Sequence, residues 1–211
     1  MLFAFLVAAW PAAAQSPHTH EHRFSDAERW AKEFDDPKRD AWQMPHEVIQ
    51  ALAPAPDAVI ADIGSGTGYF AVRFARMVPK SRVYGVDTEP DMVKYLAARA
   101  QREGLANLVA AAAAPGDAKL PEPADLAVLV DVYHHIEQRE AYFAKLRGEL
   151  KPGARVAIID FRMDSPVGPP PTARIAPERV KAEMRKAGYA LDGEQGFLPY
   201  QYFLVFRAAG R

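Results

Sequence analysis

Residues 59–70 read VIADIGSGTGYF, a stretch that leads from an apolar strand through a glycine turn into a helix. Residues 58–63 show no alternation of polar and apolar positions, which is typical of a central parallel strand covered on both faces. Gly64, Gly66 and Gly68 follow at every second position, where the missing Cβ lets the backbone turn tightly and lets a ligand approach the main chain. In open parallel sheets the ligand binds beyond the carboxyl ends of the strands, so we expect a binding site at this turn.

The rest of the chain repeats the same alternation of short apolar runs and helical stretches. It predicts helices at residues 26–34, 68–78, 90–104, 137–150 and 177–188, and strands at 58–63, 82–86, 108–112, 126–130, 155–159, 190–198 and 201–206. Alternating strands and helices imply a parallel sheet with right-handed crossovers, and the short connection at Pro199-Tyr200 implies a hairpin. We therefore predict a doubly wound α/β fold: a mostly parallel seven-stranded sheet with helices on both faces and an antiparallel last strand.

The composition is that of an ordinary globular protein and excludes several kinds of site. Of 211 residues, 49% are hydrophobic and 25% charged, and 26 Lys and Arg against 27 Asp and Glu give a net charge of −1. A dedicated nucleic-acid binder carries a basic excess, so we expect no nucleic-acid partner. With no cysteine, the chain has no disulfide, thiolate zinc site, iron–sulfur cluster or thiol nucleophile.

The first fourteen residues, MLFAFLVAAWPAAA, are uncharged and almost entirely apolar. As a helix they would rise about 21 Å, less than the roughly 30 Å hydrocarbon core, so we expect no stable membrane span. They end in small residues at the positions that signal peptidase accepts. We expect residues 1–15 to be an export signal and the protein to be periplasmic. A buried first element, an uncleaved anchor or a misread start, with a cytoplasmic enzyme, are the alternatives.

His18, His20 and His22 alternate in residues 16–25, a pattern compatible with metal binding in an extended segment. A solvated polar linker explains them better, and none of the site residues predicted below is a metal ligand.

Residues 26–211 are then expected to form one domain, with an N-terminal helical cap at residues 26–52. In this cap Trp30, Phe34 and Trp42 would pack onto the domain.

Asp62 and Tyr69 indicate which ligand the glycine turn takes. A dinucleotide fold requires the pattern G-x-G-x-x-G, but the third of those positions is Tyr69 and the third glycine comes one residue early, at Gly68. Asp62, two residues before Gly64, would repel a pyrophosphate but suits a ligand with an ammonium group. S-adenosylmethionine carries an ammonium and a sulfonium and no phosphate. A nicotinamide cofactor, or a turn without any ligand, is the weaker reading.

Asp87 follows the second predicted strand, nineteen residues after Gly68. This is near the spacing at which an acid binds both ribose hydroxyls in nucleotide-binding sheets. Asp87 can also cap the helix that begins near Pro90, and the two roles are compatible.

Four motifs in order make residues 58–161 resemble the class I S-adenosylmethionine-dependent methyltransferases. They are the D-x-G-x-G-x-G turn of residues 62–68, the acid Asp87, the sequence DVYHHI of residues 131–136 and the sequence LKPGA of residues 150–154. The third of these resembles the small-molecule and quinone-type branch of the family.

The resemblance implies a set of residues that bind S-adenosylmethionine: Asp62, Gly64, Gly66, Gly68, Asp87, Met92, Asp117 and Asp131. Asp62 would hold the amino group through backbone or water, Asp87 the ribose, and Met92 would pack near the adenine or simply belong to the core. The acid that this family often has after its third strand is missing from the alanine-rich run here. Asp117, with the backbone of Ala114 as a substitute, is the candidate for the adenine amino group.

The resemblance also places the acceptor side near His134 and His135, the candidate catalytic bases, since an imidazole titrates near neutral pH. Packing or helix capping is the alternative role, and only one of two adjacent histidines can readily face the site. Asp131 and Tyr133 are candidates for lining this pocket.

Phe161 and Tyr200, near strand ends, are further candidates for the acceptor pocket. Arg39 in the cap would meet the cofactor carboxylate, or else pair with Asp36 or Asp40.

These residues predict a methyltransferase that moves a methyl group to a small-molecule or lipid-like acceptor by in-line displacement. The alternative is an exported protein that binds S-adenosylmethionine or a related nucleoside without catalysis. A nicotinamide-dependent oxidoreductase is disfavoured by Tyr69 and Asp62.

Overall fold

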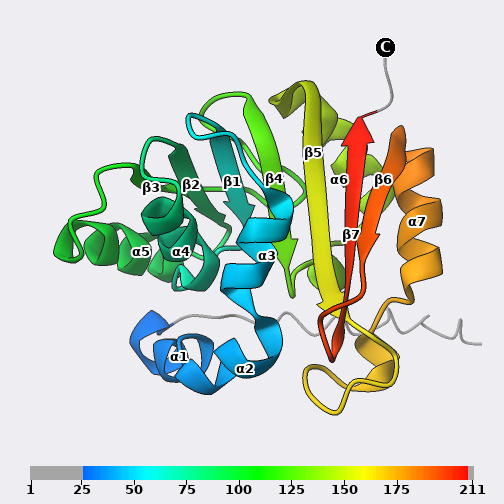
Figure 1. Ribbon diagram of the computed structural model, residues 1–211, viewed down its shortest axis with the longest axis horizontal. Coiled ribbons are helices and arrows are strands. Elements are labelled where there is room, and N and C mark those ends of the chain that lie inside the picture. The colour runs from blue at the N-terminus through cyan, green and yellow to red at the C-terminus, as the bar shows by residue number, and fades with distance from the viewer. Residues whose placement is uncertain (1–25, 209–211) are drawn as a thin grey trace, which may run out of the picture.

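A seven-stranded sheet forms the centre of the computed structural model, which describes residues 26–208 (Figure 1). The strands are β1 (Val59–Ile63), β2 (Arg82–Asp87), β3 (Leu108–Ala112), β4 (Ala124–Val130), β5 (Leu150–Phe161), β6 (Tyr189–Gln195) and β7 (Gln201–Ala208). Their order is β3-β2-β1-β4-β5-β7-β6, and only β7 runs antiparallel to its neighbours. The predicted sheet, with its antiparallel last strand, is confirmed.

Burial explains which strands are central. All five residues of β1 are buried, as its uninterrupted apolar run predicted. β3 lies at the edge, and its Val109 is 49% exposed. The glycine turn therefore leaves the best-covered part of the sheet.

Helices cover both faces of the sheet (Figure 1). α3 (Pro45–Leu52), α4 (Tyr69–Met77) and α5 (Pro90–Arg102) pack on one face, and α6 (Arg139–Leu146) and α7 (Pro177–Lys186) pack on the other. Proline at the first turn of α3, α5 and α7 is well placed, because its missing N–H has no intrahelical partner there.

The predicted N-terminal cap divides into two parts. α1 (Ala27–Phe34), a 3₁₀ turn (Pro37–Arg39) and α2 (Asp40–Gln43) lie across the lower edge of the sheet in Figure 1, where β1, β4 and β5 end. α3 belongs instead to the core, because its Val48, Ile49 and Leu52 are buried against the sheet. We use "cap" below for residues 26–44 only.

The largest boundary difference concerns Lys151-Pro152-Gly153, which we expected to separate a helix at 137–150 from a strand at 155–159. The helix ends earlier, with α6 followed by a 3₁₀ turn (Arg147–Glu149), and β5 begins at Leu150. The pairing of β4 with β5 shifts register between Ala124 and Leu126, and Gly153 has a φ of 78°. The three residues thus form an irregularity inside β5, which a turn signal in the sequence does not distinguish from a loop.

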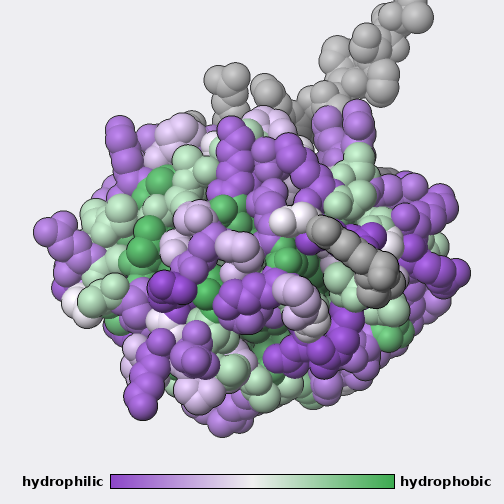
Figure 2. All heavy atoms as spheres, turned by 90° about the horizontal axis from the view of Figure 1, so that it is seen from above, coloured by the Kyte–Doolittle hydropathy of each residue, from purple (hydrophilic) through white to green (hydrophobic). Residues whose placement is uncertain are grey.

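Two further 3₁₀ turns, Tyr133–His135 and Pro171–Ala173, complete the described elements. Within residues 26–208 no helix is both long enough and apolar enough to cross a membrane. The predicted export signal and the histidines at 18, 20 and 22 lie outside the described residues. Figure 2 shows the upper end of the molecule, opposite the cap, where hydrophilic side chains predominate.

Candidate active site

β1 and β4 are neighbours at the point where the strand order changes direction: β2 and β3 continue on one side, and β5, β7 and β6 on the other. Such a switch point is where ligands bind in open α/β sheets. The glycine turn follows β1, and the 3₁₀ turn with the two histidines follows β4. The main sequence motifs therefore meet at one place.

The glycine turn excludes other residues at two of its three positions. Gly64, Gly66 and Gly68 all have positive φ, at 72°, 53° and 94°. A Cβ on Gly64 would lie 2.4 Å from Val132 Cγ2, and one on Gly68 would lie 2.3 Å from Leu96 Cδ1. Both the backbone conformation and the close packing thus require glycine.

Asp62 is a buried carboxylate with an open hydrogen-bonding position. Its side chain is 3% exposed and its Oδ2 has no partner. Burial raises the pKa of Asp62 to about 7; the N–H of Ala71 opposes this shift and the charge of Asp87 adds to it. The hydroxyls of Ser65 and Thr67 in the turn are also buried without partners. An amino acid moiety fits this set, because an ammonium can satisfy the carboxylate and a carboxylate can accept from the hydroxyls.

Asp87 ends β2 and joins the glycine turn to α5. Its Oδ2 accepts from the Gly66 N–H at 2.8 Å and its Oδ1 from the Glu89 N–H at 2.9 Å. Burial raises its pKa. Asp87 thus braces the turn before α5 but does not cap the helix, because the N-cap residue is Glu89 and no side chain accepts from the first helical N–H groups. Each Asp87 oxygen keeps a lone pair that can accept from a ribose hydroxyl. Ribose binding stays a prediction.

Met92 and Asp117, predicted near the adenine, lie in different settings. Met92 is 1% exposed, as a core residue would be. Asp117 accepts from Lys145 Nζ at 2.7 Å, and this lysine holds the pKa of Asp117 below its usual value. The backbones of Ala114 and Asp117 exchange two hydrogen bonds, of 3.0 and 2.9 Å. The Asp117 carboxylate is thus engaged by α6, and its role toward adenine also stays a prediction.

Asp131, just after β4, connects the cap to the sheet. Its Oδ2 accepts from Gln43 Nε2 at 2.9 Å, its Oδ1 accepts from Gln201 Nε2 at 2.5 Å, and Arg39 lies 3.6 Å away. Burial raises the pKa of Asp131 to about 6; the charge of Asp160 adds to the shift and Arg39 opposes it. The residue that we expected to contact cofactor or acceptor therefore also anchors the cap.

His134 forms a buried pair with Asp160 at the end of β5. The His134 Nδ1 lies 2.9 Å from both carboxylate oxygens, and the His134 backbone N–H donates to Oδ2 at 3.1 Å. The two side chains are 6% and 3% exposed. A carboxylate on Nδ1 fixes the orientation of the ring and leaves Nε2 as the nitrogen that can accept a proton.

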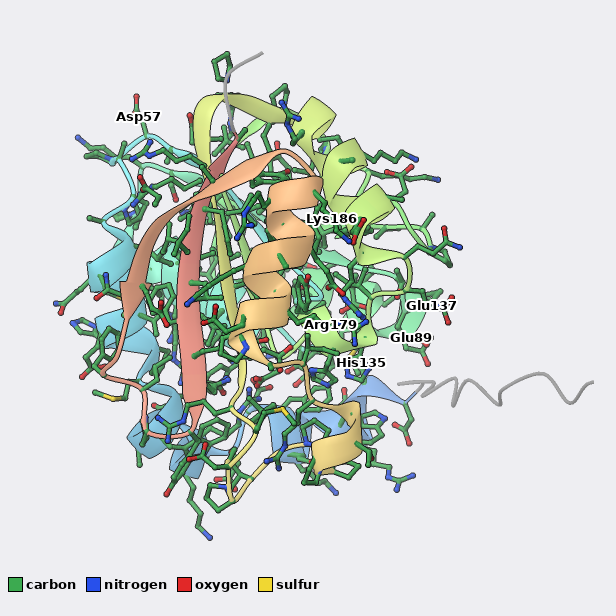
Figure 3. The ribbon with its side chains drawn as sticks, turned by 90° about the vertical axis from the view of Figure 1, so that its right-hand side faces the viewer. Asp57, Glu89, His135, Glu137, Arg179 and Lys186 are labelled. Carbon is green, nitrogen blue, oxygen red and sulfur yellow. The ribbon has the colours of Figure 1, made fainter. Side chains whose placement is uncertain are left out.

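His135 and Tyr133 do not share this environment. The His135 ring lies against that of His134, tilted by 40° with centroids 4.0 Å apart, but His135 is exposed. Figure 3 labels it below Arg179 of α7. Tyr133 is fully buried against Phe143, and its hydroxyl donates to Glu183 at 2.7 Å. Of the two histidines only His134 is enclosed, and Tyr133 is a core residue rather than a pocket wall.

Arg39 pairs with neither Asp36 nor Asp40, and its contact with the cofactor carboxylate stays a prediction. Its guanidinium lies 4.2 Å from the centre of the Tyr69 ring and its Nε donates to Gln43 at 2.9 Å. Asp40 pairs with Arg73 instead, at 2.8 Å. The guanidinium is held between the cap and α4, because Gln43 offers it an amide oxygen and Tyr69 a ring face.

Aromatic side chains surround the outer end of the site. The Trp30 and Phe34 rings stack at 5.3 Å, and Phe34 lies over the turn, 3.4 Å from where a Gly66 Cβ would be. Trp42 contacts both Phe161 and Tyr200, with ring centroids 6.1 Å apart in each pair. Phe34 and Trp42 thus pack onto the domain as predicted, whereas Trp30 stacks on Phe34 within the cap.

Three residues that shape the site, Asp160, Gln43 and Gln201, were missed in the sequence. Asp160 carried one signal, since it is an acid that ends an apolar strand in AIIDF, next to the strand that leads to His134. The two glutamines carried none, because Gln43 and Gln201 lie 88 and 70 residues from their partner Asp131.

The sheet order, the glycine turn and the acids at the switch point together define a Rossmann-like methyltransferase. The family described as a methyltransferase domain matches residues 55–201. The chain belongs to this family, the class I S-adenosylmethionine-dependent methyltransferases, and S-adenosylmethionine is its expected cofactor. Neither a nicotinamide enzyme nor a non-catalytic binding protein is favoured by this match.

Relatives of known activity span longer chains. Acetylserotonin O-methyltransferase of Mus musculus is 30% identical, over 93% of this chain and 56% of its own. Protein-L-isoaspartate O-methyltransferase of Aeropyrum pernix is 29% identical, over 58% of this chain and 44% of its own. This chain thus spans about half the length of these curated relatives.

Among solved structures, an S-adenosylmethionine-dependent methyltransferase of Aquifex aeolicus superposes with a TM-score of 0.80. The two are 24% identical, and the match covers 87% of this chain and 99% of that one. The likeness shows a shared fold. Within residues 26–208 no cluster of three or more His, Asp or Glu side chains has the arrangement of a metal site.

Proposed function

We propose that the protein transfers the methyl group of S-adenosylmethionine to a hydroxyl group of a small-molecule acceptor, with His134 as the general base. The observation that carries this proposal is the buried pair of His134 and Asp160. His134 lies in the turn after β4, and Asp160 lies near the end of the neighbouring strand β5. A hydroxyl oxygen is a weak nucleophile until its proton is removed, and a positioned imidazole contributes about 10²–10⁴-fold to such steps.

The cofactor side would be formed by Asp62, Asp87 and the glycine turn of residues 64–68. Bound there, S-adenosylmethionine supplies an electrophilic methyl carbon, which leaves the sulfonium for the acceptor oxygen and yields a neutral thioether. The unpartnered Oδ2 of Asp62 is the acceptor that a bound ammonium needs. Gly66 and Gly68 let a ribose approach the main chain.

The acceptor side would be formed by His134 and Asp160. Asp160 holds Nδ1, so Nε2 takes the hydroxyl proton as the oxygen–methyl bond forms, and the imidazolium is stabilised by the carboxylate. Asp160 acts through His134 and is a positioning residue. The remaining contribution is alignment, because a displacement at carbon needs nucleophile and leaving group in line.

The alternative, an exported protein that binds S-adenosylmethionine without catalysis, is supported only by the leader-like residues 1–14. A carboxylate that orients a buried imidazole at the switch point is the arrangement of a general base, so the pair favours an enzyme.

Residues 1–15 also carry our proposal that the protein is exported to the periplasm. Expression with the native N-terminus, followed by cell fractionation and intact mass measurement, tests it. We expect a periplasmic protein that has lost residues 1–14 or 1–15. Full-length protein in the cytoplasm would contradict export.

The function is tested by calorimetric titration with S-adenosylmethionine, S-adenosylhomocysteine and NAD, followed by turnover measurements on the His134→Gln variant. We expect binding of the first two ligands and not of NAD. His134→Gln should keep that binding and lose about 10²–10⁴-fold in kcat, because glutamine can bond Asp160 but cannot accept the proton. Unchanged kcat in this variant would refute the role of His134.

A further inference from the structure

Residues 162–176, which connect β5 to α7, are folded around a single side chain, that of Arg174. The segment contains four prolines and only one 3₁₀ turn. The Arg174 guanidinium donates to five backbone carbonyls, those of Arg162 (3.3 Å), Met163 (3.1 Å), Ser165 (2.7 Å), Val167 (3.2 Å) and Pro169 (2.8 Å). A guanidinium is planar and carries five N–H donors in fixed directions, so it sets the positions of these carbonyls relative to one another.

Residues 162–176, held by Arg174, pack against the acceptor side of the site. Gly168 has a φ of 90°, and a Cβ there would lie 2.6 Å from Phe161 Cδ1, so its backbone lies directly on the Phe161 ring. The Phe161 ring meets the His134 ring edge-on, with centroids 6.3 Å apart. The Arg162 N–H donates to the Tyr200 carbonyl at 3.0 Å, which fixes the start of the segment to the start of β7.

The segment and the cap meet at Trp42. Both occupy the lower edge of the molecule in Figure 1, and the Trp42 ring contacts Phe161 on one side and Tyr200 on the other. Phe161 is 6% exposed, whereas Trp42 and Tyr200 are partly exposed. Three rings beside a general base suit an acceptor that is itself flat and aromatic, since offset ring pairs are favourable beyond their burial.

We propose that Arg174 is a positioning residue for the methyl acceptor: it holds residues 162–176 so that Gly168 fixes Phe161, and the resulting wall of aromatic rings beside His134 binds a flat aromatic hydroxyl compound. The proposal rests on the function proposed above. It assigns acceptor selection to a segment that lies outside the cofactor turn.

The test compares two ligands and four variants of the full chain. 2-Naphthol is flat, and decahydro-2-naphthol has the same carbon skeleton without aromatic rings. Their affinities are measured by calorimetry on protein saturated with S-adenosylhomocysteine, and turnover of each is followed by S-adenosylhomocysteine release. The variants are Arg174→Ala, Arg174→Lys, Gly168→Ala and the control Arg162→Ala, which removes a charge from the same segment but only an exposed pair with Asp164.

We expect the unaltered protein to bind 2-naphthol at least about tenfold more tightly than its saturated analogue. Arg174→Ala and Arg174→Lys should weaken 2-naphthol binding and raise its KM by about 10–100-fold, because a displaced wall misplaces the acceptor. Lysine fails as alanine does, since one ammonium cannot replace a five-donor fork. S-adenosylhomocysteine affinity should stay within about twofold in every variant, and Arg162→Ala should behave as the parent protein.

Equal affinity for 2-naphthol and decahydro-2-naphthol would overturn the proposal. So would an equal change in the KM for 2-naphthol in Arg174→Ala and Arg162→Ala. So would a parallel loss of S-adenosylhomocysteine affinity, which would mean general disruption. If Arg174→Ala does not fold, Gly168→Ala provides the test, because its methyl group meets the Phe161 ring directly. An unchanged KM for 2-naphthol in this variant would then refute the role of the aromatic wall. Failure of the unaltered protein to bind S-adenosylhomocysteine would instead refute the proposed function.

Discussion

Replacing Asp62 by asparagine should remove a pH-dependent loss of stability. The pKa of Asp62 rises from 3.8 to about 7 because the folded chain buries it without a partner for Oδ2. A carboxyl group whose pKa is raised on folding favours the folded state only while it is protonated. Stability is therefore lost as the pH rises from about 4 through about 7, by up to about 4 kcal/mol at about 1.4 kcal/mol per tenfold change in proton affinity.

The assay is urea unfolding of the ligand-free protein and of Asp62→Asn at pH 4.5 and at pH 8. The quantity of interest is the difference in unfolding free energy between the two proteins, in which all other titrating groups cancel. This difference should shift in favour of Asp62→Asn by about 2–4 kcal/mol between the two pH values. S-adenosylhomocysteine affinity should fall in the variant, because the cofactor ammonium loses its carboxylate.

Asp57→Asn is the matched control. Asp57 is exposed in the turn before β1 and lies at the far end of the molecule from the site (Figure 3). It should show no such pH-dependent difference. If the Asp62→Asn difference is the same at pH 4.5 and pH 8, the carboxylate is not strained by burial and our account of the cofactor site fails.

Three further variants test other parts of the site. Asp160→Asn should lower kcat by about 10²–10⁴-fold with cofactor affinity unchanged, because His134 loses the carboxylate that orients it; an unaltered kcat would refute the pair. Asp87→Ala should weaken S-adenosylhomocysteine binding at least about 100-fold in calorimetry, through loss of charged hydrogen bonds, and retained affinity would remove Asp87 from the site. Gly68→Ala should lower the free energy of unfolding by about 1–3 kcal/mol in urea titrations, because the new methyl group meets Leu96 and φ is positive; parent-like stability would contradict the packing described.

What the sequence predicted correctly was encoded locally. The strand, the glycine turn and the following helix are contiguous in residues 59–77, so a short window contains both their periodicity and their break. The position of Asp87 beside the turn was predicted because it ends an apolar run at a known distance from Gly68, and the structure places it against Gly66. Local patterns of this kind also predicted that α5 begins at Pro90 and α7 at Pro177.

What the sequence did not predict depends on contacts between distant residues. Asp160 lies 26 residues from His134, and their meeting depends on β4 and β5 being neighbours in parallel register. The Asp131 anchor needs one glutamine from the cap and one from β7. The structure also shows that His134 is buried and His135 exposed, a difference that two adjacent histidines in a sequence do not reveal.

The Asp131 anchor has a consequence for how fast a ligand can leave the turn. Phe34 covers the turn at Gly66, while Gln43 is completely buried and bound to Asp131. Any molecule seated over Gly66 must leave past these groups, so its residence time is tied to local opening of the cap rather than to its own contacts alone. Dilute denaturant that frays residues 26–44 without unfolding the sheet should accelerate exchange, and amide hydrogens of the cap should report the same opening rate.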